Sequence, residues 1–152
     1  FCEPEEPSKN VTQTLKDIFD ICVGPVVDYR DEKEGPLRPY VVSRGLKSWS
    51  IQKEISSKRK YAGKSFKGPF VVIKRTSRAT DENRAMATVI NIDEPVYVDN
   101  HLIILKPKAK TLTACNLAIR ILKNKRTNDW LNEQIRCRHL TVKVVSNIPI
   151  WQ

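Results

Sequence analysis

The spacing of apolar residues changes near residue 107, and this change predicts a sheet followed by helices. Before that point, short runs rich in β-branched residues are bounded by turn residues, which is typical of buried strands. These runs predict strands at residues 19–23, 40–42, 70–73, 86–90, 96–98 and 102–105. After residue 107, apolar residues recur at helical spacing over residues 112–122 behind a cap at Thr111. A second helix is expected from Thr127, with Trp130, Leu131 and Ile135 on its buried face.

The two ends of the chain predict smaller features. Residues 1–13 are rich in Pro, Glu, Ser and Asn and are expected to be a linker or tail, so the domain spans residues 14–152. Thr14 and Thr141 are each expected to cap a short turn, and residues 148–151 an edge strand. The sequence therefore predicts an α+β fold, with a twisted, mostly antiparallel sheet and helices packed toward its C-terminal part.

The composition excludes several classes of protein. With 40% hydrophobic and 29% charged residues, the chain of 152 residues falls in the range of one globular domain. No apolar run approaches the roughly 20 residues of a membrane helix, so no membrane partner is expected. The four cysteines form no C-x-x-C pair, which argues against a zinc site and agrees with reduced thiols in the cytoplasm. Because the first residue is Phe1 and no signal core follows, we expect a piece of a longer protein.

Positive charge is concentrated in the middle of the chain. The net charge is +10, and residues 38–84 alone hold 13 Lys and Arg against three Asp and Glu. Residues 1–37 carry a net charge of −5 and residues 85–152 one of +5. A concentrated positive field attracts a polyanion better than the same charge spread evenly, so nucleic acid is the leading partner. A solvated basic face without a partner is the plain alternative.

The candidate DNA contacts form three groups. Arginine suits guanine edges and phosphates because its guanidinium donates two parallel hydrogen bonds, whereas lysine acts as a point charge toward phosphates. The first group follows the strand at residues 70–73 and consists of Lys74, Arg75, Thr76, Ser77, Arg78, Asn83 and Arg84. The second flanks Tyr61 and Phe66, for which ordinary packing is favoured, and consists of Lys58, Arg59, Lys60, Lys64 and Lys67. The third consists of Arg136 and Arg138, which either reach the DNA backbone or fix the end of the preceding helix.

Signatures of enzymes are missing from the sequence. It has no Gly-rich phosphate loop, G-x-S-x-G elbow or H-E-x-x-H motif, and His101 and His139 are expected to be structural. A metal-dependent nuclease is one alternative, because carboxylates can hold Mg²⁺ and activate water. Its candidate residues are Asp28, Asp31, Glu32 and Glu34 with Lys33. We favour solvated loop charge, since a nuclease fixes its carboxylates on adjacent strands. A protein-interaction module with a basic face is a third hypothesis.

The order of several short motifs resembles a known family. The early motifs are Leu15-x-Asp17-Ile18-x-x-Ile21-x-x-Gly24, residues 68–73 (GPFVVI) leading into Arg-Thr-Ser, and residues 100–105 (NHLIIL). These are similar to DNA target recognition domains. The ending, with residues 127–132 (TNDWLN), 135–142 (IRCRHLTV) and Ile148-Pro149, is similar to the C-terminus of bacterial adenine-N6 DNA methyltransferases. The resemblance covers about residues 14–151 and extends to type I specificity-subunit domains.

This resemblance implies a DNA-reading role without catalysis. In that family the domain follows an S-adenosylmethionine-binding catalytic domain, or lies in a separate specificity subunit, and holds duplex DNA so that a flipped adenine reaches the methyltransferase. The catalytic Asn/Asp-Pro-Pro-Tyr/Phe motif is absent here, so this chain is assigned no catalytic residue and no cofactor. Double-stranded DNA and an upstream methyltransferase domain or subunit are the implied partners. Recognition loops vary within the family, so Arg75, Arg78 and Arg84 are predicted base readers on their chemistry and placement alone.

Overall fold

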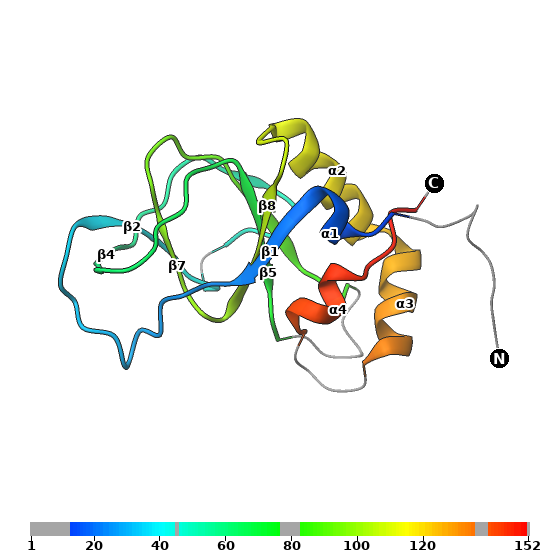
Figure 1. Ribbon diagram of the computed structural model, residues 1–152, viewed down its shortest axis with the longest axis horizontal. Coiled ribbons are helices and arrows are strands. Elements are labelled where there is room, and N and C mark those ends of the chain that lie inside the picture. The colour runs from blue at the N-terminus through cyan, green and yellow to red at the C-terminus, as the bar shows by residue number, and fades with distance from the viewer. Residues whose placement is uncertain (1–12, 45, 77–82, 136–139, 152) are drawn as a thin grey trace.

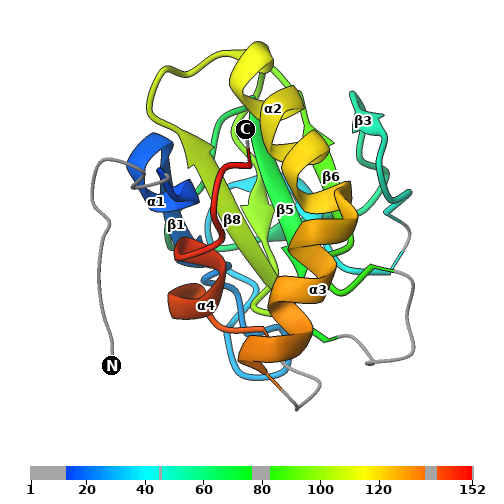
Figure 2. The ribbon, with the colours of Figure 1, turned by 90° about the vertical axis from the view of Figure 1, so that its right-hand side faces the viewer.

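The computed structural model describes residues 13–44, 46–76, 83–135 and 140–151, which form two sheets and four helices (Figures 1 and 2). The helices are α1 (Leu15–Ile18), α2 (Leu112–Lys123), α3 (Lys125–Gln134) and α4 (Val142–Ser146). The strands are β1 (Phe19–Val23), β2 (Leu37–Val41), β3 (Ile51–Gln52), β4 (Lys58–Lys60), β5 (Phe70–Lys74), β6 (Ala87–Ile90), β7 (Tyr97–Val98) and β8 (Leu102–Pro107). Within the described ranges, no helix has the length and apolar character needed to cross a membrane.

The larger sheet separates two hydrophobic cores. Its strand order is β1-β8-β5-β6-β3, and only β3 pairs parallel, with β6. Successive residues of a strand point to opposite faces, so Val71 and Ile73 of β5 join the core under the helices. Phe70 and Val72 join the core on the other face. Burial on both faces explains why β5 and β8 have nearly continuous apolar sequences.

The smaller sheet covers the face that the helices leave open (Figure 1). Its order is β4-β2-β7, with β2 antiparallel to β4 and parallel to β7. The Tyr97 hydroxyl lies 2.8 and 2.9 Å from the carbonyl oxygens of Pro36 and Tyr61, which share its single proton, and so holds the neighbouring loops onto this sheet. The domain therefore has three layers: helices, a five-stranded sheet and a three-stranded sheet.

The helical layer is fixed by caps and by contacts of the C-terminal segment. Figure 2 shows α2 lying over β5 and β6 and continuing into α3, with α1 and α4 next to β1. The side chains of Thr111 and Thr141 accept backbone hydrogen bonds at the starts of α2 and α4, as predicted. The hydroxyl of Thr127 donates to the Ile121 carbonyl and accepts from the Trp151 indole at 2.6 Å. These bonds join α2, α3 and the end of the chain.

The α+β prediction is confirmed, and four of the six strand pairings are antiparallel. Three details differ from the expectation. Helix α3 begins at Lys125 rather than Thr127, because Asn124 caps it by accepting from the Arg126 N–H at 2.8 Å. β3 and β4 were not predicted, since both are short and largely polar. The predicted edge strand at residues 148–151 is reduced to one bridge, between Pro149 and Thr14.

Candidate nucleic-acid interface

The turn between β7 and β8, residues 99–101, is held by three separate parts of the chain. The Asp99 N–H donates to the Val41 carbonyl of β2 at 3.0 Å, and the Asn100 N–H donates to the Val26 carbonyl at 2.8 Å. The Asn100 carbonyl accepts from Nη1 of Arg75 at 2.9 Å. Gly24 permits this packing, because a Cβ there would collide with the Asp99 carbonyl. The 99–101 turn is therefore a rigid part of the fold.

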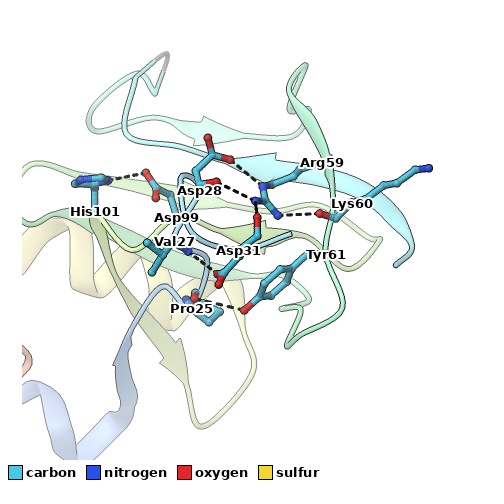
Figure 3. Close-up of polar contacts among 9 residues, drawn as sticks. All are labelled: Pro25, Val27, Asp28, Asp31, Arg59, Lys60, Tyr61, Asp99 and His101. Atoms are coloured by element: carbon cyan, nitrogen blue, oxygen red, sulfur yellow. Dashed lines mark hydrogen bonds and ion pairs between the residues drawn. The ribbon is translucent and has the colours of Figure 1, made fainter. Parts of the chain in front are cut away.

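His101 projects from this turn with its ring oriented by Asp99. Its Nδ1 lies 2.9 Å from Oδ2 of Asp99, and the two side chains are 68% and 11% exposed (Figure 3). A carboxylate only accepts hydrogen bonds, so the Nδ1 atom must carry the proton. The other ring nitrogen, Nε2, is left for an external partner. The sequence-based expectation of a purely structural histidine did not foresee this exposure.

Unsatisfied polar atoms concentrate around the same turn. Among the described residues, four buried side-chain atoms lack a hydrogen-bond partner: the Tyr40 hydroxyl, Nε of Arg75, Oδ1 of Asp99 and Oδ1 of Asn100. Burial first, and then the Asp99 carboxylate, raise the pKa of Tyr40, so this hydroxyl stays a donor. Buried polar atoms are normally paired, so this local group of exceptions identifies the turn as a candidate site of contact with another molecule.

Arg75 connects the turn to Leu140, in the C-terminal part of the chain. Its N–H donates to the His101 carbonyl at 3.1 Å, and its carbonyl accepts from the Leu140 N–H at 2.6 Å. Arg75 and Leu140 therefore meet at one end of the large sheet, although they lie far apart in the sequence. Ser77 and Arg78 of the first group, and Arg136 and Arg138 of the third, lie outside the described residues and stay predictions.

Arg59 is a structural residue. Its side chain is 2% exposed, and its Nε lies 2.8 Å from Oδ1 of Asp28. Its remaining nitrogens donate to the carbonyls of Lys60, Asp28 and Asp31, at 2.8, 3.2 and 2.7 Å (Figure 3). The guanidinium thus binds the loop after β1 to β4 and has no donor facing solvent. The predicted role of Arg59 in neutralising DNA does not fit this geometry, and we leave it out of the interface.

Arg84 and Asn83 are also buried. The Arg84 side chain donates from Nη1 to Asn132 at 2.6 Å, and its N–H donates to the side chain of Asn128 at 2.7 Å. Both asparagines lie on α3, one turn apart. The two asparagines of the 127–132 motif therefore fix the segment before β6 to the helical layer. This placement does not suit Arg84 as a base reader, and the same burial argues against Asn83.

Lys58 and Lys60 lie on the exposed face of β4, on either side of buried Arg59. They border a pocket of about 730 Å³ that also contains Tyr40, Asp99 and His101. A second pocket, of about 520 Å³, shares Tyr40 and Lys58 with the first and is also lined by residues 52–57, at the end of β3 and before β4. We call the two pockets together the β4 groove. Arg44 borders both parts and Lys53 the second, and charge counting along the chain had not singled out either residue.

A second group of cations lies at the opposite end of β5 and β8. Lys64, Lys67, Lys106, Lys108 and Lys110 form this lysine cluster, and all but Lys64 line a pocket of about 380 Å³ whose acidic member is Asp20. The ammonium groups of Lys64 and Lys106 lie 5.1 and 5.7 Å from the Phe66 ring centroid. Phe66 itself is buried in the core between the sheets, as the packing interpretation predicted. Lys74 and Thr76 belong to the other end, beside Arg75.

The acidic residues near Asp28 do not form a metal site among the residues that the structure describes. No group of three His, Cys, Asp or Glu side chains close enough to hold an ion occurs there. The Asp31 carboxylate accepts from the Val27 N–H at 2.8 Å, and this hydrogen bond lowers its pKa. Asp28 is paired with Arg59. These two carboxylates fix the loop that follows β1.

Comparison with solved structures finds this fold in type I restriction-modification systems. The chain superposes on a type I S subunit from M. genitalium with a TM-score of 0.51 and 14% identity, over 89% of this chain and 32% of that one. It superposes on a chain from a structure of complex assembly in a type I restriction-modification system with a TM-score of 0.58 and 16% identity, over 95% and 34% of the two chains. It thus spans about a third of each. No protein-family model and no curated protein matches the sequence. The chain has the fold of a type I specificity-subunit domain.

Proposed function

We propose that this domain recognises a specific sequence of duplex DNA for a restriction-modification system. In this proposal it positions a target adenine for a separate methyltransferase that binds S-adenosylmethionine. The observation that carries the proposal is the β4 groove, in which exposed cations lie next to a rigid turn with unsatisfied polar atoms. The specificity-subunit fold supports it, because S subunits belong to restriction-modification systems.

The two kinds of side chain in the groove suit two different tasks. Lys58, Lys60 and Arg44 are exposed cations that would neutralise phosphates, which supplies affinity without sequence preference. The 99–101 turn offers fixed polar atoms instead, and base edges are read by hydrogen bonds of defined direction. Arg75 and Thr76 lead from this turn into residues 77–82, where Arg78 stays a predicted base reader. The lysine cluster would bind phosphates further along the same duplex.

The test is selection from a pool of randomised duplex DNA at two salt concentrations, with the bound fraction sequenced. Affinity should fall about tenfold or more over a fewfold rise in salt if several phosphates are contacted. An enriched motif would support sequence recognition. The variant Arg120→Ala is a matched control, because it removes one exposed charge from α2, on the helical side of the domain. It should leave both the motif and the affinity unchanged.

Two other outcomes would change the proposal. Salt-sensitive binding without a motif would mean that specificity requires the methyltransferase partner. No binding to any DNA would contradict the proposal and favour the protein-interaction module, whose basic face would then meet an acidic subunit. No observation among the described residues favours the nuclease hypothesis, because the Asp28 and Asp31 carboxylates are engaged within the loop.

A further inference from the structure

We propose that His101 determines the preference for one base pair by accepting a hydrogen bond from an exocyclic amino group, either adenine N6 or cytosine N4. This inference rests on the proposed function and adds a specific contact to it. In duplex DNA these amino groups are the donors that face the major groove. The acceptor is Nε2 of His101, and Asp99 is the residue that positions it.

The first argument is the direction of the ring. Oδ2 of Asp99 lies 2.9 Å from Nδ1 of His101, so Asp99 retains the proton on that nitrogen. In the neutral imidazole the remaining nitrogen, Nε2, is then an acceptor. A lysine could not play this part, because its ammonium group only donates hydrogen bonds. Among the side chains that line this part of the groove, His101 therefore differs from the flanking cations Lys58 and Lys60.

The second argument is rigidity. Asp99 and Asn100 donate backbone hydrogen bonds to β2 and to the segment after β1. The carbonyls of Asn100 and His101 accept hydrogen bonds from Arg75. A contact that distinguishes bases must be held in place before the DNA arrives, since a freely rotating side chain would adapt to any base. His101 meets this condition because both its backbone and one ring nitrogen are fixed, while 68% of its side chain is exposed.

The third argument is the incomplete bonding behind the ring. Oδ1 of Asp99 and the hydroxyl of Tyr40 are buried without a partner in good hydrogen-bond geometry among the described residues, although the two side chains interact with each other, and both residues line the groove. Such atoms are costly unless a ligand or water completes them. Both residues line the pocket that His101 also lines, so a molecule bound there can complete these hydrogen bonds.

The experiment combines a protein variant with a base analogue. His101→Phe keeps a flat ring of similar size without nitrogen, and His101→Gln keeps an acceptor. The DNA carries the selected motif. At the position where the His101→Phe selection changes the motif, adenine or cytosine is replaced by a base that lacks the amino group. For the unmodified chain, loss of the amino group should lower affinity about fivefold. For His101→Phe it should cost nothing, because the contact is already lost, and His101→Gln should retain part of the effect.

Asp99→Asn separates positioning from folding. An asparagine permits the second tautomer of His101, so base preference at that position should weaken while salt-dependent affinity stays the same. A purely structural Asp99 would change stability and leave the preference intact. If His101→Phe selects an unchanged motif, the inference is wrong and sequence recognition stands. If His101→Phe weakens binding to all sequences equally, the ring contacts phosphate and the inference is also wrong. If the unmodified chain binds no DNA, both proposals fail.

Discussion

Both ends of β5 and β8 are basic, but they differ in how their side chains are held. At the end with the 99–101 turn, Arg75 and His101 are tied to backbone or carboxylate groups. At the other end, Lys106 and its neighbours lie over the Phe66 ring or around an open pocket, and the salt bridges found among the described residues involve none of them. A fixed donor or acceptor can distinguish bases, whereas a mobile ammonium group responds only to charge. Two basic regions of one domain can therefore differ in function.

The largest effect is expected on stability, at Arg59, a buried cation that lines the β4 groove. Arg59→Ala removes four hydrogen bonds and leaves the Asp28 and Asp31 carbonyls without their donor. We expect the free energy of unfolding to fall by about 3 kcal/mol, as for other buried charged hydrogen bonds. Urea denaturation measures this change.

Lys60→Ala, the adjacent exposed residue of β4, is the matched control for Arg59→Ala. It should alter stability by less than about 0.5 kcal/mol, because surface substitutions away from special features have small effects. Equal stability of the two variants would show that the loop after β1 does not depend on the buried guanidinium.

This contrast also explains how far the sequence could predict the molecule. The strands of the large sheet and the caps at Thr111 and Thr141 follow from local periodicity, which is visible in the sequence. Arg59 and Lys60 are neighbours of the same charge class, and only strand pairing decides that one is buried and the other exposed. The hydrogen bond between Arg75 and the 99–101 turn likewise depends on β5 lying beside β8, which composition does not reveal.

The next largest effect is expected on DNA affinity, at the exposed lysines that border the β4 groove. Replacing both Lys58 and Lys60 by alanine should lower affinity about tenfold for every DNA sequence and reduce the slope of log affinity against log salt by about 1.8. The selected motif should not change, because neither lysine is assigned to a base. A changed motif would move base reading from the 99–101 turn to β4.

The lysine cluster should contribute less than the groove. The double variant Lys106→Ala and Lys108→Ala is expected to lower affinity about threefold at low salt and to have little effect at physiological salt, where exposed charges are screened. The salt titration used for the groove variants measures it. A loss as large as that of the groove variant would mean that the duplex lies across both ends of the sheet with equal contact, and the distinction between them would fail.

The smallest effect is expected for the pH dependence of stability at Tyr40. It tests whether the end of the large sheet with the 99–101 turn, the turn end, differs from the lysine end through its buried polar groups. Burial and the Asp99 carboxylate raise the pKa of Tyr40 in the folded state. The unfolded chain therefore loses this proton first, so the stability from the neutral hydroxyl is complete below about pH 10 and declines as the pH rises further. Burial also raises the pKa of Cys115, to about 11, which adds a decline in stability of the same sign.

Tyr40→Phe should reduce the loss of stability above pH 10 and leave the part due to Cys115 intact. Denaturation at pH 8 and pH 10.5 measures the difference. Identical pH dependence in the two chains would mean that neither burial nor the Asp99 carboxylate perturbs the Tyr40 hydroxyl, and that buried polar groups do not set the turn end apart from the lysine end.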